Sequence, residues 1–181
     1  MQKKIIILLI TLILVGCGIS KKESYSPSPA EQEFINTFNK EKENSDYILL
    51  CEQINENATS SIGEIIWKDN KISKMVISAI TLNKKENARN ERAFNKIAKL
   101  TLDTMKKKVG INENINGVVI TMDKNYSKLE ITINTYIDFK KADKNILDNI
   151  GLNYTEEELK TTIDDMKYLM ENNGYTCKIT K

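Results

Sequence analysis

Histidine is absent from this sequence of 181 residues. Because histidine is the commonest general base and the commonest ligand of transition metals, its absence excludes Ser-His-Asp and Cys-His catalysis, histidine-containing zinc sites and phosphohistidine chemistry. Excess charge is also small: 27 basic and 25 acidic side chains give a net charge of +2, which is no electrostatic footprint for nucleic acid. We therefore predict no enzyme activity, no cofactor, no metal site and no nucleic-acid partner.

Proline is scarce and occurs only as Pro27 and Pro29. Both end a polar, serine-rich stretch that starts at Gly18, and this composition predicts an extended tether. The chain after this stretch has no proline, so nothing interrupts long strands and helices there. We expect the folded domain to span residues 46–181.

No apolar run is long enough to cross a bilayer. The run Ile5–Val15 has 11 residues, whereas a spanning helix needs roughly 20, and its length and basic start are typical of a signal peptide. It ends in residues that resemble the lipobox of bacterial lipoproteins: Leu14, Val15, Gly16 and Cys17. The resemblance implies transfer of a diacylglyceryl group to Cys17 and cleavage after Gly16. An ordinary secretory signal and an uncleaved anchor are the alternatives.

The lipobox implies a membrane-attached protein. It predicts a signal peptide over residues 1–16, a lipidated N-terminus and tether over 17–45, and the lipid bilayer as a partner through acyl chains such as palmitate. The expected location is the extracytoplasmic face of the cell membrane. Because the surplus charges of Lys3 and Lys4 leave with the signal peptide, 25 basic and 25 acidic side chains remain. Basic attraction to anionic lipid is therefore not expected to be the anchor.

The end of the tether carries the signals of a helix start. Ser28 is a suitable N-cap, Pro29 suits the first helical position, and Glu31 follows at the third position. Phe34, Ile35 and Phe38 then share one apolar face. This pattern predicts a short helix that ends near Asn39, with a continued tether as the alternative.

Alternation of apolar and polar residues predicts six strands in the domain. Asp69 and Asn70 suit the centre of a hairpin turn between the second and third strands. A long helix is expected over 84–109, where the basic residues near its start are mixed with acidic ones and favour a solvated face over an anion site. A helical turn is expected over 143–149, and Thr155 to Glu158 resembles a capping box that opens a last helix. The expected strands are 47–54, 63–67, 72–82, 117–122, 129–138 and 175–180.

This order predicts an α+β fold with a mainly antiparallel sheet and one long and one shorter helix packed on one face. In the strand 129–138, Ile131 and Ile133 alternate with Thr132 and Asn134. The alternation indicates that one face of the sheet is covered and the other is wetter.

The pattern resembles the YehR-like lipoproteins, a bacterial family of unknown function, over roughly residues 47–178. The resemblance implies a lipid-anchored, extracytoplasmic α+β domain, and it assigns no catalytic residues. The segments that carry it are Trp67 to Leu82, Ile115 to Val118, Ile137 to Asp143, Asn149 to Leu152 and Gly174 to Lys178.

Two cysteines, Cys51 and Cys177, remain once Cys17 carries lipid. They lie in the first and last expected strands, and disulfides persist outside the cytoplasm. If these strands are neighbours, the pair can form a disulfide. Two buried free thiols are the alternative. A catalytic thiol is disfavoured, because the chain has no histidine and no C-x-x-C motif to activate one.

Trp67 and Tyr126 are the candidate binding residues, because each lies beside an expected hairpin turn. Core packing is the alternative for both. The sequence thus favours a non-enzymatic binding or interaction module whose partner is an unidentified envelope protein or small ligand. A small-molecule carrier with a pocket between sheet and helices is the first alternative, and an envelope enzyme is the second.

Overall fold

The computed structural model describes residues 25–55, 59–83, 87–111, 117–152 and 154–181. The expected signal peptide, the lipobox with Cys17 and the start of the tether lie outside the described residues. Within the described ranges, no helix is both long and apolar enough to cross a membrane.

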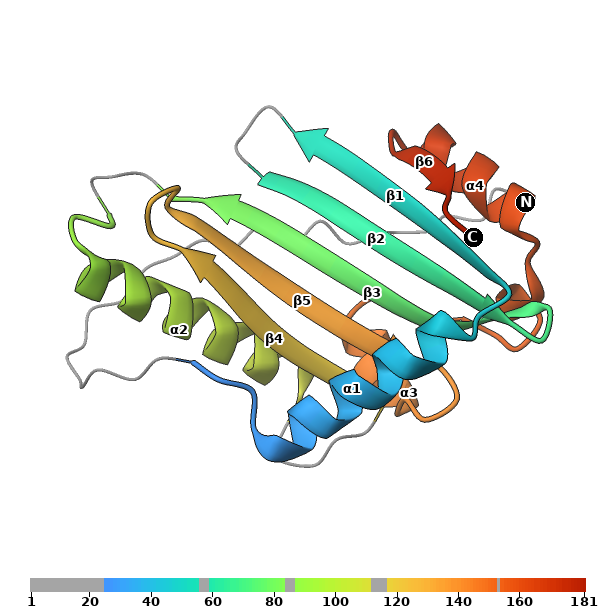
Figure 1. Cartoon of the computed structure of the whole chain (residues 1–181), viewed down its shortest axis with the longest axis horizontal. Helices are drawn as coiled ribbons and strands as arrows, with labels where there is room; N and C mark the ends of the chain where they lie inside the picture. Colours follow the sequence, from blue (N-terminus) through green and yellow to red (C-terminus); the bar gives the residue numbers. More distant parts are fainter. Residues whose placement is uncertain (1–24, 56–58, 84–86, 112–116, 153) are drawn as a thin grey trace.

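A six-stranded sheet in the order β4-β5-β3-β2-β1-β6 forms the centre of the fold, and every pair of neighbours is antiparallel (Figure 1). This confirms the α+β class with a mainly antiparallel sheet. The first and last strands of the chain are neighbours, so the C-terminal strand closes the sheet at one edge. The strands are β1 Tyr47–Asn55, β2 Thr59–Lys68, β3 Lys71–Leu82, β4 Val118–Asn125, β5 Glu130–Asp138 and β6 Thr176–Ile179.

The hairpin between β2 and β3 turns at the expected residues. Asp69 and Asn70 have φ values of 55° and 59°, and a two-residue turn with two positive φ values matches the twist of antiparallel strands. Asp and Asn tolerate this region better than other residues with side chains. The local sequence therefore sets the register of these two long strands.

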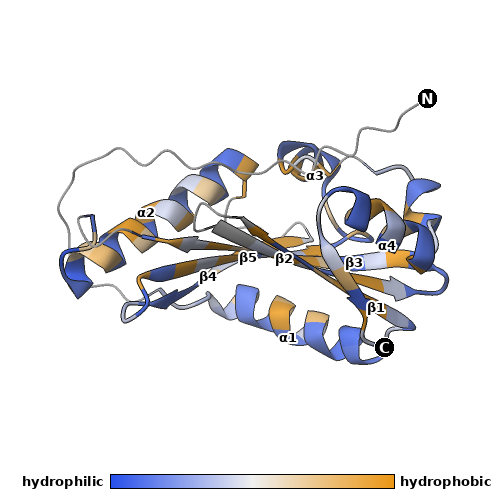
Figure 2. Ribbon diagram, turned by 90° about the horizontal axis from the view of Figure 1, so that it is seen from above, coloured by the Kyte–Doolittle hydropathy of each residue, from blue (hydrophilic) through white to orange (hydrophobic). Residues whose placement is uncertain are grey.

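Among the described elements, α2, α3 and α4 lie on one face of the sheet, and α1 lies on the other (Figure 2). The long helix α2 (Glu91–Val109), the short α3 (Lys144–Asn149) and α4 (Ile163–Asn172) cover the larger core, as expected for the long and the shorter helix. The helix α1 (Pro29–Glu43) lies on the opposite face. The sheet is thus covered on both sides, although unequally.

The helix predicted at the end of the tether is confirmed as α1, but it is longer than expected. It runs to Glu43 rather than ending near Asn39, and Ser28 and Glu31 form the expected capping box. Phe38 is only 1% exposed and packs with Ile66 and Val76 of the sheet. Because this contact buries the apolar stripe, α1 is part of the folded unit and not only of the tether.

Two helix starts differ from the sequence-based expectation. Residues 84–86 of the expected long helix lie outside the described ranges, and α2 starts at Glu91, where the side chain of Asn90 caps its first turn. The capping box from Thr155 opens only a 3-10 turn, η1 (Glu158–Lys160). The helix α4 starts later, with Thr162 as its N-cap. The N-cap of α4 is therefore Thr162, seven residues after the threonine that was expected to open this helix.

Candidate functional site

Trp67 is buried in the core and is not an exposed binding residue. Its side chain is 2% exposed, and its indole N–H donates a hydrogen bond of 2.9 Å to the carbonyl of Thr161. An apolar ring with one satisfied donor is a packing residue that ties β2 to the chain before α4. The prediction of a binding role for Trp67 is therefore wrong, and the alternative of core packing is correct.

Tyr126 lies in the turn between β4 and β5 and remains partly accessible. Its side chain is 39% exposed, and its ring centroid is 5.7 Å from that of Phe94 in α2. One side of the ring thus supports the start of α2, and the other side faces solvent. The binding role of Tyr126 stays a prediction.

Cys51 and Cys177 form the predicted disulfide. They are directly opposite each other in the pairing of β1 with β6, and both are buried. The strand β6 is short and pairs with only four residues of β1, so the disulfide fastens the C-terminal strand to the sheet. Cys51 is thereby removed as a candidate nucleophile.

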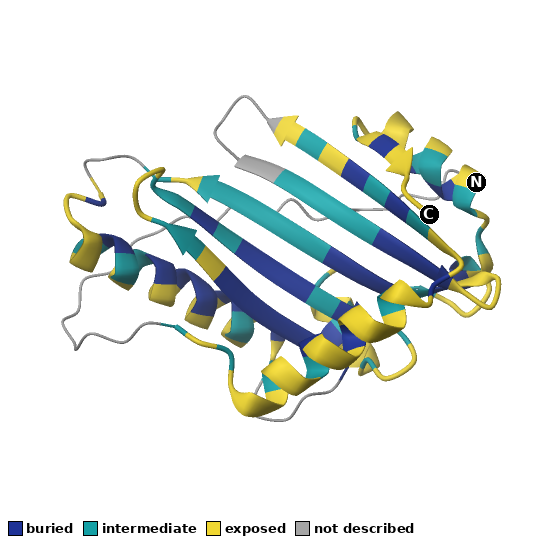
Figure 3. Cartoon of the chain, viewed as in Figure 1, coloured by how far each residue is buried: buried dark blue, intermediate teal, exposed yellow. Residues whose placement is uncertain are grey.

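The strongest candidate for a binding surface is the part of the sheet that α1 leaves uncovered (Figure 3). The helix crosses the face near one end of the strands, and the strands continue beyond it. We call this part the open face. Ile54 and Leu82 are 81% and 48% exposed there. The apolar members of the open face are Leu50, Ile54, Ile62, Ile80 and Leu82.

Polar side chains cross the middle of the open face as a hydrogen-bonded chain. The hydroxyl of Ser78 donates to the side-chain oxygen of Asn134 at 2.7 Å, and the Asn134 amide donates to Asp123 at 2.7 Å. Burial, together with the charges of Asp123 and Glu64, raises the pKa of the neighbouring Tyr136. The two hydrogen bonds link Ser78 of β3, Asn134 of β5 and Asp123 of β4 across three neighbouring strands.

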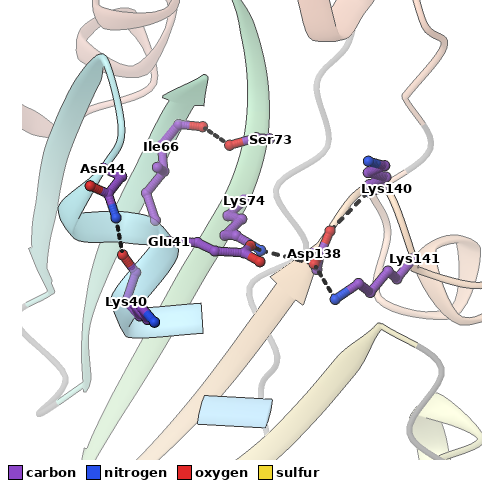
Figure 4. A network of polar contacts seen from close by, with 9 residues as sticks. All are labelled: Lys40, Glu41, Asn44, Ile66, Ser73, Lys74, Asp138, Lys140 and Lys141. Atoms are coloured by element: carbon purple, nitrogen blue, oxygen red, sulfur yellow. Dashed lines mark hydrogen bonds and ion pairs between the residues drawn. The ribbon is translucent and has the colours of Figure 1, made fainter. Parts of the chain in front are cut away.

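Lys74 is buried under α1, at the end of this sheet face that the helix covers (Figure 4). The ammonium group of Lys74 is 2.8 Å from Asp138 and 2.5 Å from Glu41, and it lies 5.1 Å from the ring centroid of Phe38. Asp138 also contacts Lys141 at 3.6 Å. These ion pairs tie α1 to β3 and β5.

A hollow of about 270 Å³ opens beside this network, between α1 and the sheet. Its wall combines the rings of Phe34 and Phe38 with the charged ends of Lys74, Asp138 and Lys141. This mixture suits a small ligand with an apolar body and a polar end. Across the described part of the chain, no three His, Cys, Asp or Glu side chains are grouped so that they could hold a metal ion.

The local sequence pattern did not predict the open face or the buried Lys74. One signal was available in the sequence. In strand β3, Lys74 and Val76 are at alternate positions and so share a face, which puts a charged residue on a face that also carries buried apolar residues. The position of Asp138 opposite Lys74 depends on the pairing of β3 with β5. That pairing joins strands far apart in the chain and could not be found from local patterns.

Comparison with solved structures identifies the same fold elsewhere. The NMR structure of YehR from Escherichia coli matches with a TM-score of 0.52 and 22% identity, over 74% of this chain and 90% of that one. The NMR structure of a protein from Streptococcus pneumoniae TIGR4 matches with a TM-score of 0.55 and 16% identity, over 93% of this chain and 94% of that one. No family model and no curated protein matches the sequence. The chain therefore has a YehR-like fold, and identities this low show the fold alone.

Proposed function

We propose that this chain is a lipid-anchored, extracytoplasmic binding module that is not an enzyme, and that its open face contacts an envelope protein. The observation that carries the proposal is the uncovered apolar surface beyond α1, where Ile54 and Leu82 are 81% and 48% exposed. Apolar side chains grouped on one face of a folded domain are typical of interaction sites. The hydrogen-bonded chain of Ser78, Asn134 and Asp123 adds polar groups that can give such a contact its orientation.

The lipobox supports the location of this module. A diacylglyceryl group on Cys17 supplies two acyl chains, which is enough for stable membrane attachment. The lack of histidine and the disulfide at Cys51 support a role without catalysis. An envelope enzyme would need a reactive side chain in a cleft, and two of the charged residues beside the α1 hollow, Lys74 and Asp138, are paired with each other.

The anchor and the binding surface are tested separately. Cys17→Ser should release the protein from membranes and abolish labelling with a radioactive fatty acid, whereas the wild-type protein should remain in the membrane fraction after a high-salt wash. A wild-type protein that is released by salt alone would contradict the anchor.

For the surface, a photo-crosslinking amino acid is placed at Ile80 on the open face. The matched control carries it at Tyr168, which is 70% exposed on α4. We expect the Ile80 probe to give a discrete protein adduct in intact cells and the Tyr168 probe to give none. Ile62→Asp in the Ile80 probe background should remove the adduct. Equal labelling from both positions, or no adduct from Ile80, would contradict a binding role of the open face.

A small-molecule carrier is the second candidate, and the hollow of about 270 Å³ beside α1 favours it. The hollow is close in size to the lower limit of about 300 Å³ for ligand pockets. Ala30 lines it, so Ala30→Phe should fill it without touching the open face. Native mass spectrometry of the protein purified from membranes should then show a bound small molecule in the wild type and none in the variant. A wild-type mass without any bound molecule would argue against a carrier.

A further inference from the structure

The helix α2 is strongly basic in a protein whose processed form has balanced charge. It carries six basic side chains and two acidic ones, a net charge of +4. We propose that the outer side of α2 lies on an anionic membrane surface and orients the anchored domain, so that the open face points away from the bilayer. This inference rests on the lipid anchor of the proposed function.

Four of the six basic residues of α2 form one stripe on its outer side, which also includes the exposed acid Asp103. Arg92, Lys96, Lys99 and Lys107 are exposed and are separated by four, three and eight residues, spacings that place them along one side of a helix. The opposite side of the helix is buried against the sheet through residues such as Phe94 and Leu102. Leu100 is 38% exposed beside the stripe. A basic, amphipathic outer face of this kind suits anionic headgroups with a shallow apolar contact.

A net acidic stretch lies at the other edge of the same face of the sheet. The stretch 155–172, which includes η1 and α4, carries six acidic and two basic side chains, a net charge of −4. The helix α2 packs against β4, whereas α4 packs against β1 and β6 at the other edge of the sheet. An anionic surface therefore attracts one edge of the domain and repels the other, which selects one orientation.

The tether meets the folded unit beside α2. The ammonium group of Lys106 lies 5.6 Å from the ring centroid of Tyr25 and 2.5 Å from Glu31 of α1. From Cys17 to Tyr25 the chain can span at most about 28 Å. A lipid on Cys17 therefore keeps α2 near the bilayer, where attraction between the stripe and the headgroups acts over a Debye length of about 8 Å at physiological salt.

A hollow between the tether and α2 has more basic than acidic side chains in its wall. It measures about 250 Å³, and Lys99, Lys106 and Lys124 line it together with the single acid Asp103. Lys106 is paired with Glu31, and Lys124 donates to the neutral amide of Asn95 at 2.6 Å. The charge of Lys124 is therefore not cancelled by this contact, and the hollow suits the phosphate of a lipid headgroup.

The test uses the lipid-anchored protein reconstituted into vesicles. A fluorophore is attached at Thr104→Cys beside the stripe or, as the control, at Ile54→Cys on the open face, and the vesicles carry a nitroxide quencher at the headgroup. In vesicles of phosphatidylcholine with one quarter phosphatidylglycerol, we expect quenching of the Thr104 label to be at least about twofold that of the Ile54 label. In phosphatidylcholine alone, or in about 1 M salt, the difference should disappear, because the attraction is electrostatic.

Charge reversal makes the test specific to the stripe. Lys96→Glu, Lys99→Glu and Lys107→Glu together should remove the difference, because each basic residue near an anionic surface contributes about fivefold in affinity. Lys71→Glu, Lys144→Glu and Lys178→Glu, which are exposed elsewhere and change the net charge equally, should leave it intact.

Two outcomes would overturn the inference: equal quenching of both labels in the anionic vesicles, or loss of the difference in both triple variants. Either result would overturn only the proposed orientation, and not the proposed lipid anchor, if the protein stays with the vesicles after a salt wash. Release of the unmodified protein by that wash would contradict the anchor itself.

Discussion

Loss of the Cys51–Cys177 disulfide should remove a large share of the stability of the domain. The two cysteines are 126 residues apart in sequence. The closed loop therefore includes the whole of β2, β3, β4 and β5, parts of β1 and β6, and every described helix except α1. In the loop-entropy model, a loop of this size stabilises the folded state by about 5 kcal/mol at 25 °C. Because whole domains are stable by only about 5–15 kcal/mol, the reduced protein is expected to be marginal.

The perturbation is Cys51→Ala with Cys177→Ala, measured by urea unfolding of residues 17–181 with Cys17→Ser as the common background. We expect the free energy of unfolding to fall by about 3–5 kcal/mol, with a similar fall when the parent is reduced with dithiothreitol. Agreement between the two separates loss of the crosslink from the cavity left by the two sulfur atoms. The tryptophan in the core gives the signal, because it moves from an apolar to an aqueous setting on unfolding.

A fall of less than about 1 kcal/mol in both forms would refute the entropic reasoning, because the model requires about 5 kcal/mol for a loop of this size. A second outcome would show which part of the domain the disulfide stabilises. The strand β6 pairs with four residues of β1, so detachment of β6 and α4 alone would appear as a separate transition. That result would show that the disulfide holds one edge strand and not the whole domain.

Three further predictions concern the core and its charges. Trp67→Phe keeps most of the packing but leaves the carbonyl that it contacts without a donor, so unfolding should become easier by about 1–2 kcal/mol, measured by circular dichroism. Gly117→Ala should cost more than about 2 kcal/mol, because its φ is 73° and an added Cβ would overlap the backbone of residues 141 and 142, whereas Gly63→Ala should change the melting temperature little. Burial alone would raise the pKa of Glu31, but hydrogen bonds and the lysine beside it outweigh burial and lower the pKa. The stabilisation is therefore present above about pH 4.5 and lost as the pH falls through the lowered pKa, so Glu31→Gln should destabilise the protein at pH 7 and have no effect near pH 2.

Local signals were sufficient for most of the sheet. The alternation in 129–138 and the Asp69-Asn70 turn depend on neighbouring residues only. The strand β5 and the turn both lie within a few residues of their expected places. The disulfide was also within reach, because two cysteines in the first and last strands leave few partners. Local patterns were misleading where two helix starts competed, as at Thr155 and Thr162.

The candidate site was largely outside the reach of sequence reasoning. Trp67 has the size and position of a binding residue, and only the packing of η1 over the sheet shows that it is buried. The open face exists because α1 crosses one end of the strands and no other described element covers the rest, and neither fact follows from the periodicity of any single segment. The open face is the part of the sheet that other elements do not cover, so its location depends on how the whole chain is arranged.

The distribution of charge bears on the proposed membrane orientation more than the net charge does. The chain after the predicted cleavage site is neutral in its side chains, which argues against a basic anchor, but α2 and the stretch 155–172 carry charges of +4 and −4 at opposite edges of one sheet. A neutral protein with this separation responds to an anionic surface by orientation more than by affinity. In the proposed arrangement, the lipid supplies attachment, the basic helix α2 sets the orientation, and the open face is left free for a partner on the side away from the bilayer.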